Sequence, residues 1–158
     1  MNYHLDDLVI SLNGITTVGL MDTWLWLIKD FKEVLIISKL GDMFFVGLDD
    51  CIYCLATDVC ELTKAADNKR EFYNFLNDEE KTDNWFLPQL LEELEKAGIR
   101  LRYNQVYSYK KMPVLGGEYI IDNIEPVDIN IHFRLTGIFG EQIKDLPDGA
   151  KIKIKIVD

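Results

Sequence analysis

The chain has 158 residues, of which 48% are hydrophobic and 28% are charged, and its formal net charge is −10. This length and apolar content predict one globular domain with a packed core and exclude a disordered chain. The negative charge opposes nucleic-acid binding, because phosphates attract basic proteins. No apolar run approaches the roughly 20 residues that span a bilayer, so we expect no contact with a membrane.

The N-terminal sequence MNYHLDDL places two acidic residues where a signal peptide would be apolar, so we expect a cytoplasmic protein. The odd number of cysteines, at positions 51, 54 and 60, argues against a disulfide framework. Cys51 and Cys54 form a C-x-x-C pair, but residues three apart on a strand face opposite sides. We expect buried, unreactive thiols; the alternative is a metal or redox role.

The negative charge is concentrated in the middle of the chain. Residues 49–95 contain 13 acidic and 4 basic residues, whereas residues 96–158 contain 8 acidic and 10 basic residues. A surface of this kind would attract a cationic protein partner. The alternative is an acidic surface that only improves solubility.

Apolar spacing predicts a helix from Tyr3 to Leu12 and a short helix from Asp22, as its N-cap, to Ile28. Trp24 and Trp26 cannot share one face of such a helix, so one should pack inside and the other lie at an edge. Four short β-rich runs follow, separated by turn residues, and predict an antiparallel meander: residues 34–38, 43–48, 51–56 and 60–64.

Two helices are predicted next, the first capped by Asp67 or Asn68 and the second running from Thr82 or Asp83 to Gly98. The last third holds a strand within residues 99–109. The alternation of residues 129–135 predicts a further strand, although a single helix over residues 128–145 is the alternative. A turn at 145–149 precedes a last strand at 151–156. The fold class is therefore α+β, a single domain over residues 1–158 with an antiparallel sheet and helices packed mainly on one side.

The sequence contains no recognisable catalytic constellation. Its two histidines are His4, near the chain end, and His132, which we interpret as a hydrogen-bonded structural residue. Gly116 and Gly117 lack the Lys and Ser/Thr of a phosphate loop, and Glu118 would repel phosphate. We therefore predict no enzyme activity, no cofactor and no metal.

Polar and aromatic residues surround the Gly-Gly loop in sequence and could line a pocket. The candidates are Tyr107, Glu118, Asn123 and His132. Such residues either bind a ligand or hydrogen-bond the loop to itself. The first interpretation would make the protein a stand-alone ligand-binding or sensing domain.

These residues also carry a family resemblance. The motif segments are Gly98–Leu101, Tyr107–Lys110, Pro113–Tyr119, Asn123–Asp128, His132–Phe133, Gly137, Gln142 and Lys144–Gly149. Together they resemble the C-terminal domain of the immunity protein that neutralises a DNase toxin of the type VI secretion system, over residues 33–150. The resemblance implies an α+β binding domain without enzymatic activity.

Charge and resemblance together predict an immunity-type protein that binds a cationic toxin, a nuclease, through an acidic face. The predicted partner-binding residues are acids of the helical segment with one aromatic anchor: Asp78, Glu79, Glu80, Asp83, Trp85, Glu92, Glu93 and Glu95.

Overall fold

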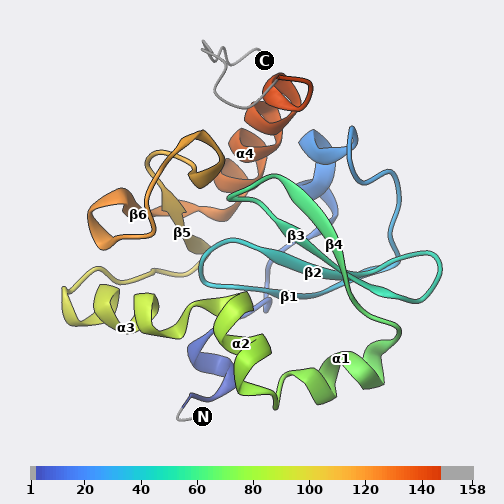
Figure 1. Cartoon of the computed structure of the whole chain (residues 1–158), viewed down its shortest axis with the longest axis horizontal. Helices are drawn as coiled ribbons and strands as arrows, with labels where there is room; N and C mark the ends of the chain where they lie inside the picture. Colours follow the sequence, from blue (N-terminus) through green and yellow to red (C-terminus); the bar gives the residue numbers. More distant parts are fainter. Residues whose placement is uncertain (1–2, 147–158) are drawn as a thin grey trace.

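A four-stranded antiparallel sheet forms the centre of the computed structural model, which describes residues 3–146 (Figure 1). Its strands lie side by side in chain order: β1 (Glu33–Ile37), β2 (Met43–Val46), β3 (Ile52–Ala56) and β4 (Glu61–Ala66). The predicted meander is confirmed. Short turns between the strands allow each to pair with the next one.

Both faces of this sheet are buried. On β2, Phe44 and Val46 point into one core cluster, and Met43 and Phe45 point into another on the opposite face. All four residues are buried. This explains the continuous apolar run of β2, because a strand that is covered on both faces does not alternate with polar residues.

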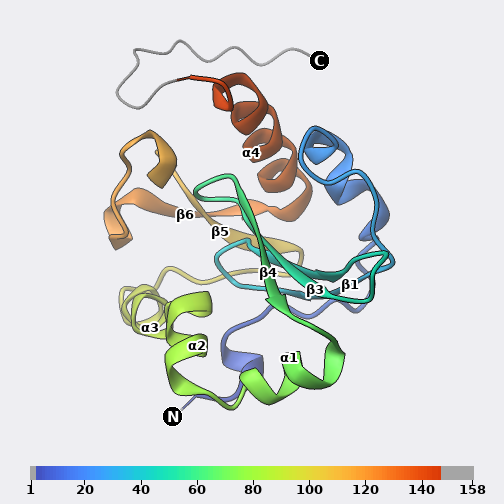
Figure 2. The ribbon, with the colours of Figure 1, turned by 45° about the vertical axis from the view of Figure 1, so that its right-hand side comes forward.

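Three helices cover the face on which Phe44 lies (Figures 1 and 2). They are α1 (Lys69–Phe75), α2 (Glu79–Phe86) and α3 (Pro88–Lys96). Two helices were predicted for this segment, and the structure has three. The first predicted helix corresponds to α1, and the second is interrupted and begins earlier than expected.

The boundaries of these helices have local causes. Asn68 caps α1 and Asp78 caps α2, each by accepting a backbone hydrogen bond from the first turn. Thr82, predicted as a cap, lies inside α2 and is buried. Leu87 then adopts a left-handed conformation (φ 47°), and Pro88 begins α3, where its missing N–H costs nothing. The chain therefore turns a corner between α2 and α3.

The other face of the sheet packs against α4 (Ile129–Ile143) and the 3₁₀ helix η2 (Val18–Trp24), which lie together in both views. Asp22 lies inside η2 and is not an N-cap, so the predicted helix was wrong in its boundaries. The rings of Trp24 and Trp26 stack 5.5 Å apart. Trp24 is fully buried and Trp26 is partly buried, and both indole N–H groups donate to carbonyls of α4.

The strand predicted for residues 129–135 was wrong, and the helical alternative is correct. Asp128 caps α4 by accepting hydrogen bonds from the N–H groups of Asn130 and Ile131. The buried side of α4 includes His132, Thr136 and two glycines, and Ile131 is 50% exposed. The helical period was hidden because polar and small residues occupy much of the inner face.

A second, two-stranded sheet pairs β5 (Gln105–Tyr109) with β6 (Ile124–Asp128). The predicted strand in this region is thereby confirmed. The Tyr107 N–H donates to the Lys39 carbonyl at 2.7 Å, which joins β5 to the turn after β1. Two short 3₁₀ helices, η3 (Pro113–Leu115) and η4 (Ile121–Asn123), shape the connection between the two strands.

The N-terminal helix was also predicted wrongly. Only η1 (Leu5–Asp7) is helical, and the chain then extends along β1, where Val9 bridges Ser38. The apolar residues of this segment pack because it lies against the sheet edge, which needs no helical period. The predicted last strand at 151–156 lies outside the described residues.

The α+β fold class is confirmed. Within residues 3–146, three of the four α-helices cover one face of the main sheet and α4 covers the other, so the helices lie mainly on one side. No helix of this described part combines the length and the apolar character needed to cross a membrane.

Candidate functional site

Seven exposed acidic residues were predicted to bind a partner, and the structure places them at three locations. Asp78, Glu79 and Glu80 lie at the start of α2; Glu92 and Glu95 face a groove; and Asp83 and Glu93 line a second cleft. The predicted acids are therefore all exposed but differ in their surroundings.

The acids at the start of α2 have a structural role. The Asp78 carboxylate accepts a hydrogen bond from the Lys81 N–H at 3.2 Å. Glu79 and Glu80 occupy the first turn, where negative charge interacts favourably with the unpaired N–H groups of the helix end. The presence of acidic residues at these positions is thus partly explained by their stabilisation of α2.

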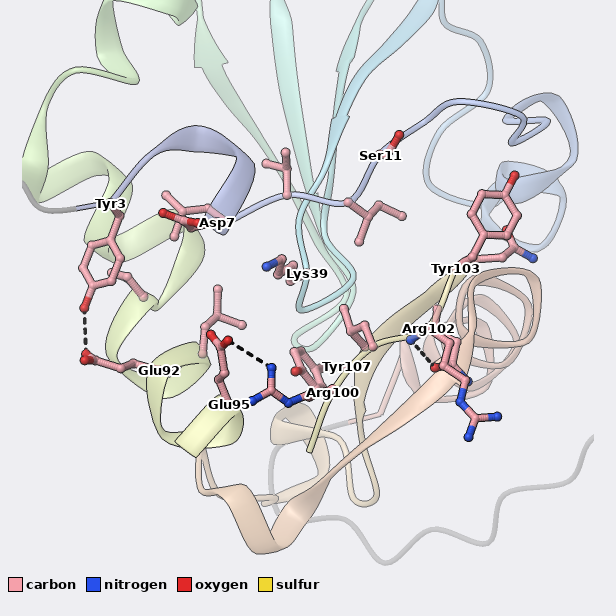
Figure 3. A pocket seen from close by; sticks show the side chains of 18 residues that line it. Tyr3, Asp7, Ser11, Lys39, Glu92, Glu95, Arg100, Arg102, Tyr103 and Tyr107 are labelled. Carbon is pink, nitrogen blue, oxygen red and sulfur yellow. Dashed lines mark hydrogen bonds and ion pairs between the residues drawn. The ribbon is translucent and has the colours of Figure 1, made fainter. Parts of the chain in front are cut away.

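The groove beside α3 has a volume of 640 Å³ and lies between the N-terminal segment, α3 and residues 100–107 (Figure 3). Both of its predicted acids have partners. Glu92 accepts a hydrogen bond from the Tyr3 hydroxyl at 2.9 Å, and Glu95 pairs with Arg100 at 3.3 Å. Lys96 also lies 3.4 Å from Glu92, so both carboxylates are partly neutralised within the chain.

The charge of this groove is mixed. Figure 3 shows the Lys39 ammonium group pointing into it, and Arg100 and Arg102 lie on its wall. Tyr107 also lines it, with its hydroxyl donating to the Ile99 carbonyl at 2.6 Å. The lining contains both cations and carboxylates, so the electrostatics of the groove favour neither sign of ligand.

Trp85, the predicted aromatic anchor, is partly buried in the core. Its ring contacts Phe44, Phe72 and Phe86, with centroids 5.1, 5.7 and 6.4 Å away. The ammonium group of Lys81 lies 5.9 Å from its centroid. Trp85 thus stabilises the packing of α2 on the sheet, and its remaining surface lines the second cleft.

That second cleft, called the acidic cleft below, has a volume of 470 Å³ at the corner between α2 and α3. Four carboxylates line it: Asp42, Asp58, Asp83 and Glu93. Its other wall is largely apolar and contains Leu40, Trp85, Leu87, Pro88 and Leu90. Among the described residues, no lysine or arginine belongs to its lining, which distinguishes it from the groove of Figure 3.

Asp42 and Asp58 come from the turns that follow β1 and β3. One carboxylate oxygen of Asp42 accepts a hydrogen bond from the Thr57 N–H at 3.0 Å. Asp58 accepts one from the Tyr119 hydroxyl at 2.7 Å. Burial, and then the charge of Asp58, raise the pKa of Asp42 well above its ordinary value. Burial is the larger cause of this increase in pKa, and the negative field of Asp58 adds to it.

The same field acts on neighbouring groups. Burial raises the pKa values of Cys54, Tyr109 and Tyr119, and the charges of Asp42 and Asp58 add to each increase. A cation that entered the cleft would reverse this effect, because it would stabilise the ionised carboxylates.

Sequence reasoning found only part of this cleft. Asp83, Trp85 and Glu93 were among the predicted residues, whereas Asp42 and Asp58 were missed. Tertiary packing brings the turns of the meander beside the α2–α3 corner, and no spacing in the sequence reports such a contact.

His132 lies in the core and not in a pocket with Glu118. Its Nε2 is 2.9 Å from the Gly41 carbonyl, which can only accept, so Nε2 carries the proton. Its Nδ1 then accepts from the Ser108 hydroxyl at 2.9 Å. Burial lowers the pKa of His132 to about 4, so the ring is neutral near pH 7. The interpretation as a structural histidine is confirmed.

The Gly-Gly loop is hydrogen-bonded to itself. The Asn123 side-chain amide donates to the carbonyls of Lys111 and Glu118, both at 2.9 Å. A Cβ at Gly117 would overlap the Lys111 carbonyl, and Gly116 has a φ of 94°. Asn123 and both glycines therefore hold the loop, and the four residues of the alternative pocket do not converge on either cavity described above.

The three cysteines are free. Burial raises the pKa of Cys60 to about 12, and that of Cys54 is also raised well above its ordinary value. Thiols of this kind are poor nucleophiles at neutral pH. Within residues 3–146, no group of three His, Cys, Asp or Glu side chains is arranged to hold a metal ion.

Residues 66–139 match the family described as T6SS immunity protein Tdi1, C-terminal. The predicted family resemblance is confirmed. The match is shorter than the predicted range of 33–150 and includes Asp83, Trp85, Glu93 and Tyr119 of the acidic cleft. Asp42 and Asp58 precede the matched segment, so the cleft combines family and non-family parts of the chain.

A search of curated proteins finds no match. Among solved structures, the chain is similar to the crystal structure of Atu4351 from Agrobacterium tumefaciens, with a TM-score of 0.46 and 17% sequence identity. The similarity covers 75% of this chain and 62% of that chain, so this chain spans less than two thirds of that protein.

Proposed function

We propose that this protein is a non-enzymatic immunity-type protein that binds and neutralises a nuclease toxin through the acidic surface of α2 and α3. The observation that carries the proposal is the match of residues 66–139 to an immunity-protein family. A nuclease needs a basic surface to hold the phosphate backbone of its substrate. An acidic protein surface that covers it would block access of the nucleic acid.

The charge distribution supports this proposal. Residues 49–95 carry 13 of the 27 acidic residues and 4 of the 17 basic ones. The acids of α2 and α3 are exposed, and Asp83 and Glu93 border the acidic cleft, where the described lining residues include no cation. Binding driven by such charges should be fast and sensitive to ionic strength.

The test is co-expression with the toxin encoded by the neighbouring gene. The protein should restore growth, and the purified pair should bind with an affinity that decreases as salt increases. The variant Asp83→Asn/Glu92→Gln/Glu93→Gln should bind roughly 3- to 150-fold more weakly, since three exposed charge pairs of about 0.2–1 kcal/mol each would be lost.

The matched control removes three charges from another exposed region, as Glu118→Gln/Asp122→Asn/Glu125→Gln. This variant should retain wild-type affinity to within about twofold if the α2–α3 surface forms the interface. Absence of growth rescue by the wild-type protein contradicts the immunity function. Equal losses in both variants contradict the α2–α3 surface as the interface.

A further inference from the structure

We infer that the acidic cleft receives one arginine side chain of the protein partner. The inference rests on the proposed function, because it assigns a specific contact within the proposed toxin interface. It concerns Asp42 and Asp58, which lie outside the matched family segment, together with Asp83 and Glu93, which lie inside it.

The carboxylates of the cleft lack the cation partner that several other acids of the described chain have. Glu33 pairs with Lys69, Asp50 with Lys32, and Asp67 with Lys64 at 2.5 Å. Glu92 and Glu95 likewise have Lys96 and Arg100 beside them. Asp42, Asp58, Asp83 and Glu93 have no ion pair within residues 3–146. A cation from a partner would therefore not have to displace a lysine or arginine of the described chain from these carboxylates.

Asp42 shows most clearly where such a cation would lie. Its carboxyl group is deep in the protein, yet the residue is accessible from the cleft. Oδ1 is held by the N–H and hydroxyl of Thr57, at 3.0 and 3.3 Å. Oδ2 has no hydrogen-bond donor among the described residues. No buried side-chain oxygen of the described residues lacks a partner, so Oδ2 is open to the cleft, where a guanidinium group would donate a hydrogen bond to it.

The shape and chemistry of the cleft favour arginine. Arginine presents five N–H donors in a planar fork, so it can serve Asp42 and Asp58 together. Leu40, Leu87 and Leu90 provide an apolar wall for the methylene groups of its stem. Trp85 lies on the same wall, and guanidinium groups stack well on aromatic rings. A compact ammonium group would use fewer of these features.

The cleft is also held in position before any partner binds. Asp42 follows Gly41, whose carbonyl accepts hydrogen bonds from Thr57 and His132, and Tyr119 fixes Asp58. These bonds tie the turns after β1 and β3 to α4 and to the loop before η4. A preorganised site loses less conformational entropy when it binds, so more of the interaction energy appears as affinity.

The inference can be tested without the toxin, by NMR titration with N-acetyl-argininamide. The probe should cause saturable shifts of the backbone amides of Asp42 and Asp58 and of the Trp85 indole N–H. N-acetyl-citrullinamide, which is neutral and nearly the same size, should leave these signals unchanged at the same concentration. The Asp42→Asn/Asp58→Asn variant should bind the arginine probe at least tenfold more weakly.

The control variant Asp22→Asn/Asp30→Asn removes two charges from exposed positions outside the cleft and should bind like the wild type. Equal shifts with both probes, shifts outside the cleft only, or an unchanged affinity in the cleft variant would overturn the inference. Since asparagine can still accept the Thr57 hydrogen bonds, the cleft variant should fold, and the comparison of probes in the wild type is independent of that variant.

The two proposals fail separately. Growth rescue by the wild-type protein without cleft-specific binding of the arginine probe refutes the cleft and leaves the immunity function. Binding of the probe in the cleft without growth rescue refutes the immunity function. With both established, Asp42→Asn/Asp58→Asn should lower the affinity for the toxin at least tenfold, and an unchanged affinity would exclude the cleft from the interface.

Discussion

At the scale of single residues, Gly41 and His132 are mutually dependent. Gly41 has a φ of 84°, and a Cβ at this position would overlap the imidazole ring of His132. Gly98 has a similar φ of 78°, but a Cβ there would meet no described atom within 4 Å. Substitutions at the two positions can therefore distinguish the cost of the backbone conformation from the cost of a steric clash.

We predict that Gly98→Ala lowers the free energy of unfolding by about 1–2 kcal/mol, the cost of a left-handed alanine. Gly41→Ala should cost about 1–3 kcal/mol more, because the added methyl group also overpacks the core against His132. Urea denaturation of the two variants measures the difference. Equal costs would mean that the His132 ring moves away without penalty.

We predict that His132 contributes to the free energy of unfolding at neutral pH and that this contribution is lost in acid. Its folded pKa of about 4 lies below the ordinary 6.5, so the unfolded state takes up a proton first as the pH falls. The contribution is complete above pH 6.5 and is lost as the pH approaches 4, and its size is about 3 kcal/mol. Urea denaturation at several pH values measures it.

The comparison is with His132→Gln, which does not titrate but keeps a donor for the Gly41 carbonyl. The wild type should lose more stability than this variant between pH 6.5 and 4. Asp42 works in the opposite direction, since its raised pKa stabilises the fold at low pH. That contribution is present in both proteins and largely cancels. Parallel pH profiles would show that His132 does not titrate in this range.

At the scale of elements, the acids of α2 combine charge and helix capping. Asp78 was predicted to face a partner, and it also accepts the hydrogen bond from the Lys81 N–H that begins the helix. Glu92 and Glu95 on α3 bind Tyr3 and Arg100 from other segments. Truncation of such an acid to alanine would therefore lower the stability of the protein as well as weaken any interface.

We predict that Asp78→Ala lowers the free energy of unfolding by about 1 kcal/mol, the usual value of an N-cap. Asp78→Asn should lose much less, because asparagine is an equally good cap without the charge. Thermal unfolding by circular dichroism compares the two. If both variants lose the same stability, charge and not capping explains the contribution of Asp78. If Asp78→Asn keeps the stability of the wild type, it can be used in the toxin-binding assay to measure the effect of the charge alone.

Packing of α4 on η2 depends on small residues. A Cβ at Gly137 would overlap the Thr23 side chain and lie 2.7 Å from its carbonyl oxygen, and the Gly137 carbonyl accepts a hydrogen bond from Trp26. Glycine in a helix costs about 1 kcal/mol relative to alanine. Here the close approach of the two elements outweighs that cost, because the larger residue would push them apart.

At the scale of the whole molecule, the main sheet separates two core clusters. Trp85 lies on the α1–α3 side, and Trp24 and Trp26 lie on the α4 side. β2 contributes buried residues to both clusters and connects them. A sheet that is covered on both faces should lose both layers together, which is the behaviour of one domain.

We predict a single cooperative unfolding transition that includes both faces. The variant Trp24→Phe/Trp26→Phe reports on the α1–α3 side through Trp85, and Trp85→Phe reports on the α4 side. In each variant, the denaturant midpoint from tryptophan fluorescence should equal the midpoint from far-ultraviolet circular dichroism of the same variant. Separate midpoints would divide the chain into two independently folding units.

The sequence by itself determined the elements that depend on local patterns. The meander, α1 and β5 follow from β-rich runs and helical spacing, and the interpretation of His132 as a structural residue follows from the lack of catalytic neighbours. The acidity of residues 49–95 and the family resemblance also required no structure. These properties are local or compositional, so each can be recognised without knowledge of the fold.

Only the tertiary structure decided the helical state of residues 129–143, the corner at Leu87 and the acidic cleft. In α4 the buried side is polar and glycine-rich because it packs closely on η2, which hides the apolar period. In the cleft, Asp42 and Asp58 come from two turns and meet Asp83 and Glu93 only when the sheet and the helices pack. Contacts between residues far apart in the chain thus convert a general negative charge into a cleft of defined shape.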